Sequence, residues 1–224
     1  MFKRRDSDLP GPQTGAASGA GPILQTSHAL PRLARRLSAA PHARVLDLGS
    51  VVGGNLQFFI DLGCKVTADD QQRPVETAAL TSSGGPDWKG HPRLDYPSDS
   101  FEAVLVWDFF DFLGPQEARS FSRDLHRVVK AGGIVMAYFT SRETERREPS
   151  RRFRITAPDK IEWIPLGAAR PLRHVYQNRD IERMFEGFRT HFAVVLQNGS
   201  REILLEKKRP LAAASDGAKS TPSA

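Results

Sequence analysis

The segment from Arg44 to Asp70 constrains the fold more than any other part of the sequence. It consists of an apolar strand, RVLDL, a glycine-bearing turn, a short helix over Asn55 to Leu62 and a second strand, KVTADD. A strand, a turn and a helix that lead into another strand form a βαβ unit, whose two strands lie parallel in one sheet. Backbone N–H groups and missing side chains in such a turn let a ligand approach closely. The segment therefore predicts a parallel α/β fold with a ligand site at the turn, although a tight structural turn would explain the glycines equally well.

The same alternation returns after residue 100. FEAVLVW is expected to form a buried strand, Pro115 to Lys130 a helix that ends at Gly132-Gly133, and IVMAYF the next strand. Asn178 can cap a last helix, and two strand-like segments follow it, joined through Asn198-Gly199, which is a strong hairpin signal. The pattern predicts a Rossmann-like three-layer αβα sandwich of the α/β class. Its mostly parallel sheet would be closed by an antiparallel C-terminal β-hairpin.

One domain with flanking tails is expected, because 224 residues leave little room for a second core. Residues 1–26 and 210–224 are expected to be disordered tails, since their Gly, Pro, Ala and Ser residues bury too little apolar surface. The domain would then span residues 27–209. It would begin with a helix over Ser27 to Ala39, with Ser27 as its N-cap, and include a weaker helix over Pro74 to Leu80.

Composition favours a cytoplasmic protein. No apolar run approaches the roughly 20 residues that a membrane-spanning helix needs, and no apolar signal segment follows Met1. The single cysteine, Cys64, is expected to pack in the interior, and a lone cysteine fits a reducing compartment. The formal net charge is +6, with arginine concentrated from Arg142 to Arg154. A solvated loop is the simpler interpretation of that segment, and a contact with nucleic acid is the alternative.

The second strand of the βαβ unit ends in Asp69-Asp70, about 20 residues after the turn. A carboxylate at that place can accept hydrogen bonds from both hydroxyls of a ribose. An aspartate that caps the following turn is the alternative interpretation.

Together these segments, from Arg44 to Lys207, resemble the class I S-adenosylmethionine-dependent methyltransferases, in particular small-molecule enzymes with a type 11-like domain. VLDLGSVVGG resembles the family's VLDLGCGTG first motif, and YPSDSFEAVLVWDFFDFL resembles its PFPDNSFDLVLSSDVLEHL segment. HRVVKAGGIVMAYF is similar to the family's RVLKPGGRLVL segment, and NRDIERMFEGF to the helix before its last hairpin.

The resemblance implies S-adenosyl-L-methionine as the cofactor and a small-molecule methyl acceptor as the partner. Asp47 would lie near the sulfonium and amino end of the cofactor, and Asp70 would bind its ribose. Packing in the core is the alternative role of Trp107. The cofactor-binding residues that the resemblance implies are Asp47, Gly49, Ser50, Val51, Gly53, Asp70, Trp107 and Asp108.

Two departures from the family's pattern motivate a second hypothesis, a catalytically degenerate methyltransferase-like domain that serves binding or scaffolding. Val51 replaces the family's middle glycine, and a β-branched residue resists positive φ. The family's acid for the adenine amine has no clear match, with Asp87 and Asp95 as nearby candidates. A nicotinamide-dependent oxidoreductase is disfavoured, because Val51 also breaks the G-x-G-x-x-G pattern. RNA methylation is a minor alternative.

No catalytic residue is assigned. Methyl transfer from a sulfonium is an in-line displacement, for which alignment supplies much of the rate and a general base is optional. Asp108 and Asp111 could orient an acceptor, although charges at a helix N-terminus are the simpler interpretation. His174 and Tyr176 are candidates for a substrate lid. The histidines show no metal-ligand spacing, and no Asn/Asp-Pro-Pro-aromatic tetrapeptide points to methylation of a DNA base.

Overall fold

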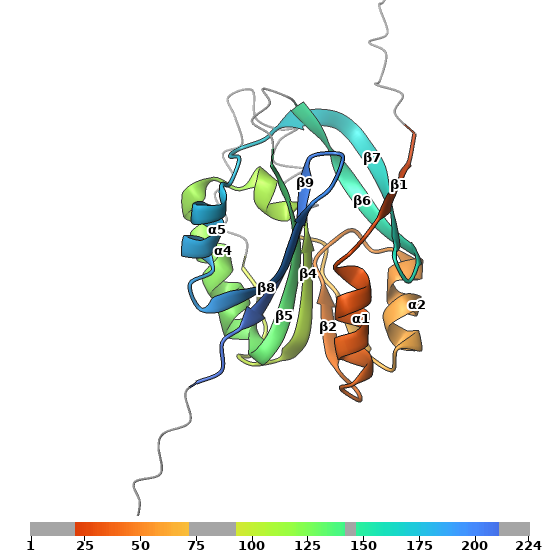
Figure 1. Ribbon diagram of the computed structural model, residues 1–224, viewed down its shortest axis with the longest axis vertical. Coiled ribbons are helices and arrows are strands. Elements are labelled where there is room, and N and C mark those ends of the chain that lie inside the picture. Colours follow the sequence, from red (N-terminus) through yellow and green to blue (C-terminus); the bar gives the residue numbers. More distant parts are fainter. Residues whose placement is uncertain (1–20, 72–92, 142–146, 211–224) are drawn as a thin grey trace, which may run out of the picture.

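The computed structural model describes residues 21–71, 93–141 and 147–210 (Figure 1). Its centre is a six-stranded sheet with the strand order β3-β2-β4-β5-β9-β8. The strands, in chain order, are β2 (Arg44–Asp47), β3 (Lys65–Ala68), β4 (Phe101–Trp107), β5 (Val129–Thr140), β8 (Phe188–Val195) and β9 (Ser200–Lys207).

The central sheet is mixed. Strand β2 pairs in parallel with β3 and β4, and β4 pairs in parallel with β5. Strand β9 is antiparallel to both β5 and β8. The turn between β8 and β9 places Gly199 at a φ of 82°, a conformation that glycine adopts without steric cost. This is the α/β, Rossmann-like architecture that the sequence predicts.

Helices cover both faces of this sheet (Figure 1). One face carries α4 (Pro115–Val128) and α5 (Asn178–Met184), and the other carries α1 (Leu30–Ser38) and α2 (Gly53–Asp61). A short 3-10 helix, η1 (Phe109–Phe112), follows β4 directly.

A second, smaller sheet packs above α1 and α2 (Figure 1). It contains β1 (Ile23–Thr26), β6 (Arg147–Ala157) and β7 (Lys160–Pro171), all antiparallel, in the order β1-β7-β6. Two predictions are therefore wrong. The arginine-rich segment is not a solvated loop from Arg147 onwards, because Phe153 and Ile155 turn their side chains into the core. The ordered chain also begins before residue 27, because β1 pairs with β7.

Some helix ends differ from the predicted ones. Helix α4 ends at Val128 and strand β5 begins at the next residue, so Gly132-Gly133 lie within the strand and do not end the helix. The pairing of β4 with β5 is irregular there, and Gly132 has a φ of 78°. The Ser27 hydroxyl does accept a hydrogen bond from the Leu30 amide at 2.9 Å, although helix α1 begins three residues later than predicted. The predicted helix over Pro74 to Leu80 lies outside the described residues.

The central strands divide the core into two layers. Side chains alternate along a strand, so Leu46 and Val104 face α4 while Val45 and Leu105 face α1 and α2. The layer beneath α4 and α5 contains a cluster of phenylalanines, and the layer on the other face also takes in side chains from the small sheet. Cys64 is buried in this second layer, as predicted.

Candidate cofactor site

The candidate site lies at the carboxyl ends of β2 and β4. The chain leaves β2 toward β3 on one side, and β4 then pairs on the other side of β2, so the strand order reverses between these two strands. Ligands of open α/β sheets bind in the crevice outside the carboxyl ends of the strands at such a switch point. Asp47 ends β2 and Trp107 ends β4, so the predicted pair lies at this switch point, and the region outside the ends of the two strands is called the crevice below.

Asp47 is buried and accepts several hydrogen bonds from within the protein. Its Oδ1 accepts bonds from the indole Nε1 of Trp107 at 2.6 Å and from the Gly49 amide at 3.0 Å. Its Oδ2 accepts a longer bond, 3.4 Å, from the Asn55 side chain. Burial raises the pKa of Asp47 above its ordinary value, the charge of Asp70 adds to the rise, and the three donors oppose it. Both carboxylate oxygens are thus engaged by protein groups.

Trp107 lies directly on the glycine turn. A Cβ atom at Gly49 would lie only 2.6 Å from the indole Cδ1 and Nε1, so a glycine at position 49 is what lets the indole lie against the backbone. Trp107 is 1% exposed and has a φ of 55°. That conformation costs a bulky residue on the order of 1–3 kcal/mol, and such strain gathers at functional sites. Trp107 is thus packed in the core, which is the alternative role that the sequence suggested for it.

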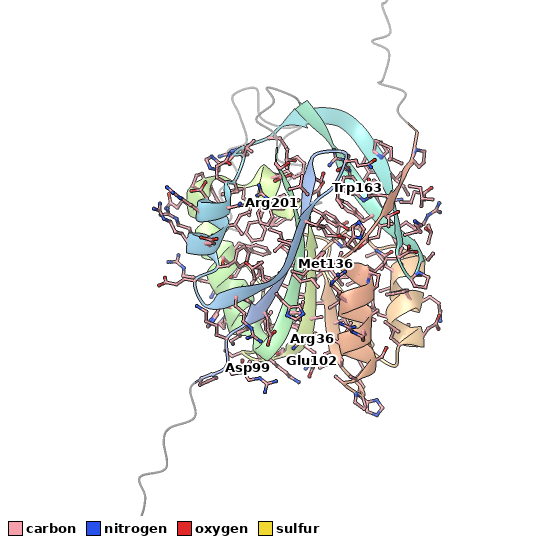
Figure 2. All side chains as sticks on the ribbon, in the orientation of Figure 1. Arg36, Asp99, Glu102, Met136, Trp163 and Arg201 are labelled. Carbon is pink, nitrogen blue, oxygen red and sulfur yellow. The ribbon has the colours of Figure 1, made fainter. Side chains whose placement is uncertain are left out.

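Aromatic rings from the small sheet hold the indole in place. Trp107 stacks on Phe153 of β6 with ring centroids 4.9 Å apart and planes 9° apart, and Phe153 stacks in turn on Tyr138 of β5. Trp163 of β7 meets the Phe153 and Tyr138 rings edge to face. Trp163 lies between the small sheet and the central sheet (Figure 2). The hairpin formed by β6 and β7 therefore covers the indole.

Asn55 fastens this hairpin to helix α2. Its Nδ2 donates to the Phe153 carbonyl at 2.9 Å, and its Oδ1 accepts from the Ile155 amide at 2.8 Å. A Cβ at Gly54 would lie 3.4 Å from the Ile155 carbonyl oxygen. Strand β6 thus lies against the first turn of α2. The unpaired N–H groups of a helix's first turn are a common binding site for anions, and here β6 covers that end of the helix.

The other predicted turn residues are more exposed than Asp47 and Trp107. Ser50 is half-buried, and Val51 and Gly53 are exposed. Val51 is 60% exposed and is absent from the residues with positive φ, so the strain predicted at this position does not arise. Asp70 is half-buried and lies two residues after the end of β3, the strand that pairs with β2. The main obstruction in the crevice is Trp107 and not Val51.

Two further carboxylates follow Trp107. Asp108 lies 3.8 Å from the Arg151 guanidinium of β6, measured from Oδ2 to Nη1. Asp111 in η1 accepts hydrogen bonds from the Thr140 hydroxyl at 2.6 Å and from the Thr140 amide. Burial raises the pKa of Asp111 to about 7, helped by the charge of Asp108 and opposed by the bonds from Thr140. Both lie at the start of η1, Asp108 as its N-cap and Asp111 in its first turn, where helix N-terminal charges are expected, and the Asp111 side chain also fastens η1 to the end of β5.

The lid predicted at His174 and Tyr176 does not form. Tyr176 is 3% exposed and its hydroxyl donates to the Leu113 carbonyl at 2.8 Å, so its ring belongs to the core. Of the two adenine candidates, Asp95 is exposed and Asp87 lies outside the described residues. Within the described ranges no group of three or more His, Cys, Asp or Glu side chains could hold a metal ion, and no helix is long and apolar enough to cross a membrane.

Comparison with known proteins bears on this site. Residues 46–137 match the methyltransferase domain family, a range that begins within β2, contains the turn and runs through β4 into β5. Residues 46–137, which are less than half of the chain, are thus similar to methyltransferase domains. S-adenosylmethionine is the cofactor of the class I members of that family.

The similarity to individual methyltransferases is distant. A malonyl-[acyl-carrier protein] O-methyltransferase from Enterobacter lignolyticus is 28% identical over 103 residues, which are 46% of this chain and 41% of that protein. The chain thus spans less than half the length of this curated relative. A solved Pyrococcus horikoshii protein is 19% identical, with a TM-score of 0.48, and the match covers 80% of this chain and 90% of that one. A Burkholderia thailandensis 1,6-didemethyltoxoflavin-N1-methyltransferase is 13% identical, also with a TM-score of 0.48, over 82% of this chain and 80% of that one.

The described residues at the candidate site do not fit S-adenosylmethionine in this arrangement. The glycine turn, which should leave room for a ligand, has the Trp107 indole against it, and the acceptor atoms of Asp47 are engaged. Strand β6 also lies over the start of α2.

Sequence reasoning missed three residues of the closed crevice, namely Asn55, Phe153 and Tyr138. Asn55 gave no signal, because a polar residue in the first turn of a helix is ordinary. Phe153 did give one, since RFRI alternates charged and apolar residues with the period of a half-buried strand.

Proposed function

We propose that this protein transfers a methyl group from S-adenosylmethionine to a small-molecule acceptor. The observation that carries the proposal is the crevice at the switch point between β2 and β4, which combines the glycine turn with acidic groups on adjacent strands. The matched family supports the reaction class. The acceptor of the malonyl-[acyl-carrier protein] O-methyltransferase is not carried over, because the similarity extends over only 41% of that relative.

Asp70 is the residue we assign to the cofactor's ribose. It is half-buried just beyond β3, one strand away from the turn, where its carboxylate can accept hydrogen bonds from both ribose hydroxyls. Gly49, Ser50, Val51 and Gly53 would contribute backbone to the same ligand. Asp47, Trp107 and Asp108 would flank it from the ends of β2 and β4.

The proposal is tested by titrating the full chain with S-adenosylhomocysteine, up to millimolar concentration, in a calorimeter. Binding is expected, and Asp70→Asn should weaken it at least tenfold because the amide replaces a charged acceptor for two hydroxyls. Asp61→Asn is the matched control: Asp61 is an exposed aspartate at the end of α2, and among the described residues its side chain accepts a hydrogen bond only from Gln57. Equal affinity of the Asp70 and Asp61 variants would contradict the ribose assignment, and no heat from the unmodified chain would contradict catalysis.

A second candidate function is favoured by one observation. The indole of Trp107 fills the glycine turn, which suits a methyltransferase-like domain that has lost catalysis and serves as a binding or scaffolding module. This candidate predicts no binding of S-adenosylhomocysteine by the unmodified chain. Val51→Gly, which restores the family's glycine, should then restore little affinity, because Val51 points to solvent.

A further inference from the structure

We infer that the Trp107 side chain and the cofactor are alternative occupants of the crevice between β2 and β4, so that the indole must leave for S-adenosylmethionine to bind. The inference rests on the proposed function for the identity of the ligand. It assigns to Trp107 the role of a gate on the cofactor site, in addition to lining that site.

Geometry is the first argument. Non-bonded carbon atoms pack at about 3.5–4.0 Å, whereas the indole lies 2.6 Å from the place of a Gly49 Cβ. A ligand atom in contact with this side of Gly49 would therefore overlap the indole. The indole N–H also donates a hydrogen bond to Oδ1 of Asp47. A ligand amine would need the same oxygen as its acceptor.

The backbone of Trp107 supplies the second argument. With a φ of 55° it stands in the left-handed region, which bulky residues leave readily once their contacts are lost. Rotation into the extended region changes the direction of the Cα–Cβ bond and carries the indole away from Gly49. The present position is held by the bond to Asp47 and by stacking on Phe153. A residue held in strain by a few specific contacts is poised to switch between two positions.

The hairpin of β6 and β7 couples the gate to the rest of the crevice. Phe153 stacks on the indole, and the backbone on either side of Arg154 is fastened to α2 by the two hydrogen bonds of Asn55. Release of the indole therefore removes a stacking partner of Phe153, and release of β6 uncovers the start of α2. Both changes act in the same direction, toward a crevice that is open to a ligand.

The first test follows the indole itself in the unmodified protein. Hydrogen exchange of the Trp107 indole N–H is measured by NMR, with the signal assigned by its loss in Trp107→Ser. Because that N–H is buried and bonded to Asp47, we expect slow exchange without ligand. With saturating S-adenosylhomocysteine the signal should shift and exchange at least tenfold faster. Fast exchange without ligand, or slow exchange retained at saturation, would overturn the inference.

The second test opens the crevice by substitution. Trp107→Ser removes the indole, and Phe153→Ala removes its stacking partner in case the first variant fails to fold. We expect either change to raise the affinity for S-adenosylhomocysteine at least tenfold. Phe121→Leu, which reduces a buried aromatic side chain on the opposite face of the sheet, is the control and should leave the affinity unchanged.

The outcomes separate the gate from the proposed reaction. If Trp107→Ser binds the cofactor product and the unmodified chain neither binds it nor transfers methyl groups, the gate stands and the catalytic function fails. If the unmodified chain binds it and Trp107→Ser binds at least tenfold more weakly, the indole is part of the binding surface and the gate fails while the function stands. No binding by any of these proteins would overturn both.

Discussion

The two faces of the central sheet are both rich in aromatic rings, but they are held together differently. Beneath α4 and α5 the rings belong to an apolar cluster in which Phe110 meets Phe121, Phe139 and Phe185 at centroid distances of 5.3 to 5.6 Å. On the other face the stack of Trp107, Phe153 and Tyr138 is tied down by polar groups. Trp107 bonds to Asp47, and Tyr138 bonds to the buried Glu202.

The difference follows from the elements that cover each face. A helix satisfies its own backbone groups, so α4 needs only an apolar stripe to remain in place. A strand laid across another sheet has backbone groups that need partners from outside, and Asn55 provides two of them to β6. On the helical face the packing is apolar, whereas on the hairpin face the cover over the candidate site depends on a few hydrogen bonds.

The largest loss of stability is expected from Phe121→Ala on the helical face. Phe121 is fully buried and contacts Phe109 and Phe110 edge to face or tilted. Removing a buried phenylalanine ring costs about 3–5 kcal/mol of unfolding free energy, which urea denaturation measures. The affinity for S-adenosylhomocysteine should stay unchanged in the folded fraction. A change in affinity larger than the loss of folded protein would break the contrast between the faces.

Asn55→Ala should cost less stability but alter the site. The change leaves the Phe153 carbonyl and the Ile155 amide without their side-chain partner, at about 1–3 kcal/mol for each buried group left unpaired. We expect a total loss of about 3 kcal/mol, together with faster exchange of the Ile155 amide. Gln57→Ala, an exposed change on the same helix, is the control and should cost under about 0.5 kcal/mol. An unchanged exchange rate at Ile155 would refute the fastening role of Asn55.

Tyr138→Phe tests the polar anchor of the aromatic stack alone. The Tyr138 hydroxyl donates to Glu202 at 2.7 Å, whereas the ring stacks on Phe153 without it. A hydrogen bond to a charged group contributes about 1.5–3 kcal/mol, and the lower value is expected because Ser27, His28 and Ala29 also donate to Glu202. Tyr96→Phe, whose half-buried hydroxyl bonds to Asp69, should cost less. Equal losses in the two variants would argue against a buried polar anchor.

The most gradual effect is expected in the pH dependence contributed by Asp111, because it is spread over the range between the folded and unfolded pKa values. Its pKa is raised to about 7 in the folded chain and is about 3.9 in an unfolded one. The folded state then binds more protons between these values, so this group stabilises the fold below pH 4 and loses that contribution as pH rises toward 7. The slope should be on the order of 1 kcal/mol per pH unit.

Asp111→Asn isolates the contribution of Asp111 to the unfolding free energy, because all other carboxylates titrate in both proteins. The difference in unfolding free energy between the variant and the unmodified chain should shift in favour of the variant from pH 4 to pH 7. A difference that stays constant over this range would show that Asp111 titrates normally.

Much of the fold followed from local patterns in the sequence. The strands of the central sheet and helices α2, α4 and α5 were predicted because their apolar periods and turn residues act over a few neighbouring positions, whereas β6 and β7 were not predicted. The hairpin turn at Asn198-Gly199 was recognised for the same reason, since a φ of 82° at Gly199 is what that dipeptide favours. The glycine turn and its neighbour Asp47 were placed correctly at the end of a strand.

The state of the candidate site depends on contacts between segments that are distant in the chain. Trp107 was expected to line the crevice, but its position on Gly49 depends on a rotated backbone, a carboxylate 60 residues away and a ring from a hairpin that the sequence had suggested to be a loop. Such contacts join residues far apart in the chain, and no local period encodes them. Local patterns in the sequence were enough to predict a glycine-bearing turn at the end of β2 within a parallel α/β sheet, because strands, turns and helices are locally specified. Whether the crevice is open is decided by packing between distant segments, and here the packing closes it.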